Sequence, residues 1–300
     1  MMLGFVLLGI VIQRNVTLPS IVPQRLNQFI ISCIIPALIL LRVPSIHLVP
    51  ELSIIIVMSW LAVTISALLI ILFAKKMRWS KSITGALLMT AVLGNTSYLG
   101  FPMVKLMLGE SALPLAIIYD QIGTFLALAI YGSIILAIYG EHQTPLTSWA
   151  VILKIIKFPP FLALLLALAL PAEYLPIMLI NFLHLVTLLL IPLTMLVVGL
   201  QFQLNIPQGE RLPLIIGISV KMLLTPILIF ISVFWLPVNE LIKAVVVFES
   251  AMPPMVTAGV LAMISNLAPR LAVAMVGVGL IGAVFTLPSV DLACWYFFQL

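Results

Sequence analysis

The sequence predicts an all-α integral membrane protein of ten transmembrane helices, arranged as two inverted repeats of five helices with broken fourth and ninth helices. The composition is the first observation, because 64% hydrophobic and 8% charged residues are too apolar for a water-soluble fold of 300 residues. The second is the length of the apolar runs, many of which suit a helix that crosses about 30 Å of hydrocarbon. The third is a pair of matched interruptions by proline, one in each half of the chain.

Polar stretches separate the apolar runs along the whole chain. The ten expected segments are residues 1–12, 28–47, 52–73, 83–108, 112–139, 152–170, 177–200, 212–235, 241–264 and 271–297. The first run is short, but it lacks the positive region and the cleavage site of a secretory signal, so we expect a membrane segment there.

The longest polar interval, residues 140–150, divides these segments five and five. We therefore expect one membrane domain with a first repeat at 1–139, a short central loop at 140–150 and a second repeat at 151–300. An odd number of helices in each half places the halves in opposite orientations. The second and seventh segments also resemble each other, as "IIPALIL" and "LIPLTML".

Lysine and arginine are distributed unequally between the two sides of the expected membrane domain. One side would carry most of them, namely Arg14, Arg25, Lys75, Lys76, Arg78, Lys81, Lys154, Lys157, Arg211 and Arg270. The other side would carry Arg42, Lys105 and Lys243. Because cytoplasmic loops are enriched in basic residues, we expect a multi-pass protein of the cell membrane with both termini outside.

Several functional classes are not favoured by the residues. The basic residues form no stripe with aromatic residues, so we expect no nucleic-acid partner despite a net charge of +5. Cys33 and Cys294 are far apart and lack the spacing of metal ligands or of a disulfide framework. We expect neither a cofactor nor a metal.

The fourth segment contains "GNTSYLGFP" (Gly94–Pro102), and the ninth contains "ESAMPPMVTAG" (Glu249–Gly259). Proline removes a backbone donor and glycine eases a non-helical backbone, so both helices should be interrupted. Backbone that is not helical is tolerated at membrane depth where it is buried in protein or lines a watery cavity. Matched interruptions in two halves of a chain indicate the central site of a transporter.

These stretches resemble the auxin efflux carrier family. "NTSYLGFP" is similar to the Asn-Thr and Gly-x-Pro signature of that family, and "YDQIGT", "KFPPFLALLLAL" and "AMPP" follow in the family's order and spacing. The resemblance implies a secondary carrier for organic anions, with inverted five-helix repeats, crossing broken helices and often a homodimer. The short central loop resembles that of compact bacterial members, which include carriers of carboxylates, so auxin is not transferred as the substrate.

Uncharged groups at the two interruptions are the first candidates for substrate binding. Donors and special backbone positions beside half-helix N-termini suit an anion. The expected substrate-binding residues are Asn95, Thr96, Ser97, Gly100, Pro102, Ser250, Pro253, Pro254 and Thr257. An alternative is that these side chains only satisfy the backbone of their own broken helices. We expect Pro102 near the start of a second half-helix and Gly100 at a close approach of the chain.

Asp120, Lys221 and Glu249 are expected near the membrane midplane, where charged residues are rare and costly. Lys221 would attract a carboxylate, or would neutralise the negative C-terminal ends of half-helices. Either acid would bind a coupling proton, or would form an ion pair with the lysine that holds helices together.

Two other functions were weighed against the organic anion carrier. A sodium-coupled anion symporter would share the architecture and differ in its coupling ion. An intramembrane aspartyl protease is disfavoured, because Tyr119 and Asp120 supply half of its signature and no Gly-x-Gly-Asp follows. We therefore expect a transporter and not an enzyme.

Overall fold

The computed structural model describes residues 2–16, 19, 21–44, 52–140, 149, 153, 156–170, 175–200 and 209–299. Helices form the regular structure of these ranges, together with an isolated antiparallel bridge. Within these ranges, six helices are long and apolar enough to span a membrane: Arg25–Arg42, Leu52–Met77, Glu110–Tyr139, Ile177–Leu200, Arg211–Phe234 and Pro269–Phe298. They correspond to the second, third, fifth, seventh, eighth and tenth expected segments.

The remaining expected segments differ from these six in length or continuity. The first and sixth correspond to the shorter apolar helices Gly4–Asn15 and Pro159–Ala169. The fourth and ninth are each divided into two helical parts, as the prolines and glycines predict. The central loop at 140–150 lies almost wholly outside the described residues, and the ten-helix inverted repeat stays a prediction.

The chain divides into two compact units. The first unit is Met1–Leu48 with Leu153–Phe202, and the second is Val49–Ile152 with Gln203–Leu300. Each unit therefore takes segments from both expected repeats: the first two of each half belong to the first unit, and the last three of each half belong to the second.

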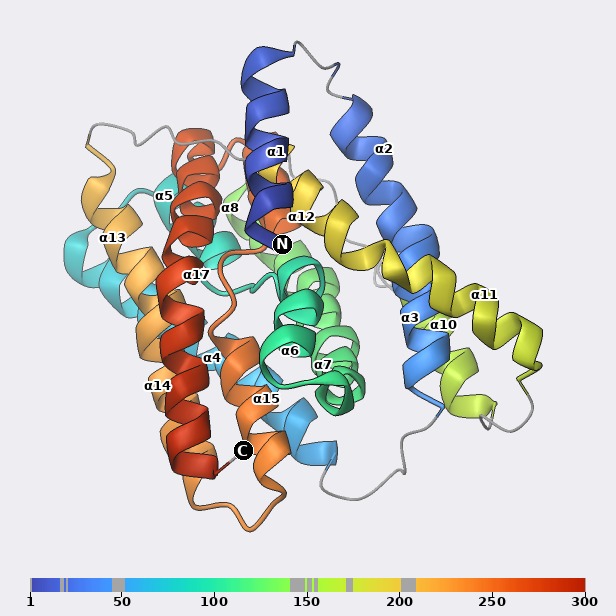
Figure 1. Ribbon diagram of the computed structural model, residues 1–300. Helices are drawn as coiled ribbons and strands as arrows, with labels where there is room; N and C mark the ends of the chain where they lie inside the picture. The colour runs from blue at the N-terminus through green and yellow to red at the C-terminus, as the bar shows by residue number, and fades with distance from the viewer. Residues whose placement is uncertain are drawn as a thin grey trace. The chain divides into compact units, whose positions relative to one another are not determined.

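The first unit is built from four expected segments. Its helices are α1 (Met2–Asn15), α2 (Ile21–Phe29), the π-helix η1 (Ile30–Ile34), α3 (Ile35–Arg42), α10 (Pro159–Ala169), α11 (Ile177–Leu188) and α12 (Leu190–Leu200). Helix α1 lies along α12 (Figure 1), and α3 contacts α10 and α11. Gly9 and Gly199 allow the close approach of α1 and α12, because a methyl group on Gly199 would lie 2.9 Å from the Cα of Gly9.

The second unit contains both interrupted segments. Its first-half elements are α4 (Leu52–Met77), α5 (Lys81–Thr90), η2 (Thr96–Gly100), α6 (Phe101–Met107), η3 (Glu110–Ala112), α7 (Leu113–Ile118), η4 (Tyr119–Phe125), η5 (Leu128–Gly132) and α8 (Ser133–Tyr139). Its second-half elements are α13 (Arg211–Ser219), η7 (Val220–Leu224), α14 (Thr225–Phe234), α15 (Glu240–Ser250), α16 (Val256–Ile264) and α17 (Pro269–Phe298). The core of this unit joins α5, α16 and α17, whose facing side chains are apolar and buried.

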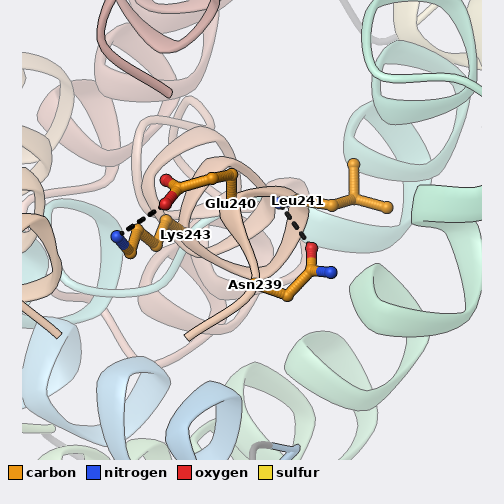
Figure 2. Close-up of polar contacts among 4 residues, drawn as sticks. All are labelled: Asn239, Glu240, Leu241 and Lys243. Carbon is orange, nitrogen blue, oxygen red and sulfur yellow. Dashed lines mark hydrogen bonds and ion pairs between the residues drawn. The ribbon is translucent and has the colours of Figure 1, made fainter. Parts of the chain in front are cut away.

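Helix α15 begins at a capped N-terminus (Figure 2). The Asn239 side chain accepts a hydrogen bond from the backbone N–H of Leu241 at 2.9 Å, and Lys243 pairs with Glu240 at 3.0 Å. An N-cap of this kind satisfies a backbone donor that has no partner inside the helix, and an acidic residue in the first turn favours the helix dipole. The cap fixes where α15 starts, and α15 leads directly into the second interruption.

Candidate functional site

The two interruptions are hydrogen-bonded to each other inside the second unit. The backbone N–H of Asn95 donates to the Pro253 carbonyl oxygen at 2.8 Å, and the N–H of Met255 donates to the Leu93 carbonyl oxygen at 2.9 Å. Gly94 and Pro254 form the antiparallel bridge between these two bonds. Backbone groups that leave one helix are thus satisfied by the other, which makes the irregular chain tolerable in a buried position.

The first interruption begins upstream of the stretch that predicted it, Gly94–Pro102, and ends within that stretch. Helix α5 ends at Thr90, and helical backbone resumes at Thr96 as the π-helix η2. The N–H of Gly100 bonds to the Asn95 carbonyl at 3.0 Å, which closes this wider turn. Pro102 lies in the first turn of α6, so it stands near the start of a half-helix segment as expected, although η2 precedes that segment.

Gly100 lies where the chain approaches a side chain of the other interrupted segment. A methyl group at this position would come within 2.7 Å of Glu249 Oε2 and 3.0 Å of Oε1. The close approach expected of Gly100 is therefore confirmed, and its partner is the carboxylate of Glu249.

Lys221 lies on the π-helix η7, and its ammonium group is placed at the end of α15. Its Nζ donates to the Ser250 carbonyl oxygen at 2.9 Å, and the residue is 3% exposed. A methyl group on Gly94 would lie 3.0 Å from the same Nζ, so the ammonium also adjoins the first interruption. Carbonyl groups at a helix C-terminus carry partial negative charge, which a lysine stabilises. The geometry fits the second role that the sequence left open for Lys221.

The side chain of Asp120, which belongs to η4, is held beside the beginning of η2 by short hydrogen bonds. Thr96 Oγ1 donates to Asp120 Oδ1 at 2.5 Å, and Gln121 Nε2 donates to Oδ2 at 2.7 Å. The Ser97 hydroxyl interacts with the same carboxylate. Hydrogen bonds from several donors, together with a helix N-terminus, stabilise an ionised carboxylate.

Glu249 is as buried as Asp120, but its carboxylate oxygens have no hydrogen-bonding partner among the described residues. The Asn95 side-chain nitrogen and the Gln121 side-chain oxygen are also buried without a hydrogen-bonding partner among these residues. Buried polar atoms without a protein partner are uncommon, and each calls for an explanation such as a bound ion, a water or a ligand. The three side chains come from the first interruption, from η4 and from the end of α15.

Most of the predicted site residues gather at this crossing. Asn95, Thr96, Gly100, Ser250, Pro253 and Pro254 are buried there, as are the charged residues Asp120, Lys221 and Glu249. Ser97 is half-buried. The Ser250 hydroxyl donates to the Val247 carbonyl of its own helix at 2.7 Å. Thr257 is exposed on the first turn of α16 and does not join the buried cluster.

Two features of the site were missed by sequence reasoning. The first is Gln121, which follows Asp120 directly. An amide beside an acid in an apolar segment is a signal that could have identified it. The π-helices η2, η4 and η7 carry the site residues Thr96, Asp120 and Lys221, but the uniformly apolar segments give no periodic signal for them. Such π turns occur often at functional sites, because they redirect side chains and free backbone groups. In η4 the Ile122 carbonyl accepts a bond from Trp60 Nε1 at 3.1 Å.

Comparison with known proteins places the chain among membrane transporters. The family described as "Membrane transport protein" matches residues 5–290. An uncharacterised transporter of Methanothermobacter thermautotrophicus is 26% identical over 268 residues, which are 88% of this chain and 87% of that protein. An uncharacterised transporter of Methanocaldococcus jannaschii is 27% identical over 177 residues, and this chain spans 55% of its length in the alignment.

These relatives are transporters, and the family match extends over almost the whole chain. The six long apolar helices of the described ranges are those of a multi-pass membrane protein. The resemblance to auxin efflux carriers that the motifs indicate is therefore confirmed at the level of the family. The chain belongs to the membrane transport protein family, which is the family of the auxin efflux carriers.

Proposed function

We propose that this transporter is a secondary carrier that moves a small organic anion, such as a carboxylate, across the cell membrane by alternating access. One observation carries the proposal: the buried crossing combines the Lys221 ammonium with the side-chain amide of Asn95, whose nitrogen has no hydrogen-bonding partner among the described residues. A cationic group and a free amide donor, placed beside the first turn of a helix, are suited to a carboxylate.

The architecture that we propose for this carrier is a ten-helix fold of two inverted five-helix repeats, with both termini outside and with assembly into homodimers. The division of the chain supports the repeats, since each compact unit takes equivalent segments from the two halves. Inverted repeats commonly generate alternating access, as one bundle moves against the other. The whole crossing lies in the second unit, and we propose that this unit moves relative to the first unit during transport.

The coupling ion has two candidates. A proton would be carried by a carboxyl group at the crossing, and a sodium ion would use carboxylate, amide and backbone oxygens there. A sodium-coupled anion symporter is the alternative function for the same architecture.

The proposal is tested with purified protein in liposomes. Radiolabelled mono- and dicarboxylates are exchanged against the unlabelled compound inside, with and without pH and sodium gradients. We expect exchange of at least one carboxylate above the level of protein-free liposomes. Transport of cations or neutral solutes, without any carboxylate exchange, would contradict the proposal.

A further inference from the structure

We propose that Glu249 carries an exchangeable proton that moves with the substrate, so that the carrier is driven by the proton gradient. This inference rests on the proposed anion transport and deepens it by naming the coupling ion and its residue. The sequence left Asp120 and Glu249 as alternative proton carriers, and this inference selects Glu249.

The first argument is the balance of charge at the crossing. Asp120 and Glu249 are two acids, while Lys221 is the basic side chain that interacts with Glu249. All are nearly or completely buried. If both acids were ionised, one negative charge would remain uncompensated in a site of low dielectric constant, which is costly. A single proton removes that charge.

The second argument is the unequal distribution of hydrogen bonds. Asp120 accepts bonds from Thr96 and Gln121, which stabilise a carboxylate, whereas Glu249 accepts none among the described residues. Lys221 directs its ammonium to the Ser250 carbonyl and forms no ion pair with Glu249. When two nearby acids share one proton, the proton resides on the acid whose charged form is less supported. In this crossing that acid is Glu249.

The third argument is the position of Glu249 between the two interruptions. It precedes Ser250, whose carbonyl is bonded to Lys221, and its carboxylate contacts Gly100 at the end of η2. A change in its charge therefore acts on both broken segments at once. The titratable groups that act on Glu249 in the described structure are Asp120, Lys221 and Tyr119.

The proton step requires no further reactant. A hydronium ion on one side of the membrane gives its proton to a Glu249 carboxylate oxygen, so that one O–H bond forms and water is left. On the other side the O–H bond breaks, the proton returns to water, and the carboxylate is regenerated.

The experiment compares the wild-type protein with Glu249→Gln and with Glu240→Gln in liposomes. The control residue lies on the same helix, and a glutamine there can still accept the bond from Lys243. Internal pH is followed with a trapped dye while a carboxylate gradient is applied, and uptake is measured under a pH gradient and under a sodium gradient. Infrared spectra of each protein, without substrate, report the carbonyl stretch of protonated carboxyl groups.

We expect the wild type and Glu240→Gln to show this infrared band at neutral pH and to move protons with the substrate. Glu249→Gln should lose the band and the uphill uptake driven by a pH gradient, and any substrate exchange that it shows should no longer depend on pH. Exchange that is driven by sodium and unaffected by pH would overturn the inference and leave the proposed anion transport intact. Absence of carboxylate exchange in the wild type would instead contradict the proposed function, and absence of the infrared band would overturn the protonation of Glu249 without any substrate.

Discussion

The backbone N–H of Asn95 lies 2.8 Å from the carbonyl oxygen of Pro253, and this hydrogen bond joins the two interrupted helices of the second unit. The bond uses the backbone of Asn95, and the side-chain nitrogen has no hydrogen-bonding partner in the part of the chain that the structure describes. The backbone of Asn95 thus supports the structure, and its side chain is the part that we propose binds the substrate. Substitutions of the side chain are informative for this reason.

Asn95→Leu should keep the protein folded and inserted but abolish substrate-dependent exchange. The backbone bonds that join the crossing remain, whereas the amide donor is lost. A hydrogen bond to a charged group contributes about 1.5 to 3 kcal/mol, so affinity should fall by roughly ten- to over a hundredfold. Direct titration of the purified variant measures this effect. Pro102→Ala is the milder comparison, because Pro102 lies within α6. Unchanged affinity in Asn95→Leu would exclude the amide from the binding site.

Lys221→Ala should reduce both thermal stability and transport. The substitution leaves the buried Ser250 carbonyl without its donor, and an unsatisfied buried group costs about 1 to 3 kcal/mol. Lys221→Arg should be partly active, because a planar guanidinium replaces a compact ammonium poorly next to Gly94. Thermal unfolding and carboxylate exchange are measured on the same samples. A stable Ala variant with normal exchange would show that Lys221 has no essential role in transport.

Gly100→Ala should fold but transport poorly. The added methyl group would displace the Glu249 carboxylate, which is the end of a flexible side chain and can move away from its position. We therefore expect a small change in melting temperature and a large loss of uptake driven by a pH gradient. Gly282→Ala in α17 is the matched control, because its methyl group would make ordinary contacts at 3.5 Å with Met222. Equal uptake by the two variants would contradict a role in transport for the close approach of Gly100 to Glu249.

Gly199→Ala should destabilise the first unit. Its methyl group would overlap the Val6 carbonyl oxygen, and backbone atoms cannot move aside as a side chain can. Overpacking of this kind costs about 1 to 3 kcal/mol. Gly4→Ala serves as the control, since no atom lies within 4 Å of its added methyl group. Thermal unfolding in detergent should separate the two variants, and equal melting temperatures would refute the close packing of α1 and α12.

The orientation in the membrane is tested by cysteine labelling in a Cys33→Ser, Cys294→Ala background. Lys81→Cys, in the first turn of α5, should resist an impermeant thiol reagent in intact cells, because the proposed topology places the basic loop before it in the cytoplasm. Val238→Cys, before the start of α15, should react rapidly. The opposite pattern of labelling would reverse the proposed topology.

The sequence alone determined the features that depend on local composition. Its apolar runs predict the six helices of the described residues that are long enough to span a membrane, and glycine and proline at Gly94–Pro102 and at Pro253–Pro254 predict the two interruptions. These predictions succeed because the membrane imposes helix length and internal hydrogen bonding on each segment separately. The charged residues Asp120, Lys221 and Glu249 were also identified in this way, because such residues are rare in apolar segments.

The tertiary structure decided the partners of these groups and the limits of the interruptions. Asn95 and Pro253 bond across a long stretch of intervening chain, and no local pattern specifies such a pair. The π turns place Asp120 next to Thr96 and Lys221 next to Ser250, and their registers follow from packing between helices and not from apolar periodicity. Thr257 is exposed for the same reason, since the direction of α16 is set by its contacts with α5 and α17. The sequence thus determined which residues are chemically unusual, and packing between distant segments decided which of them meet.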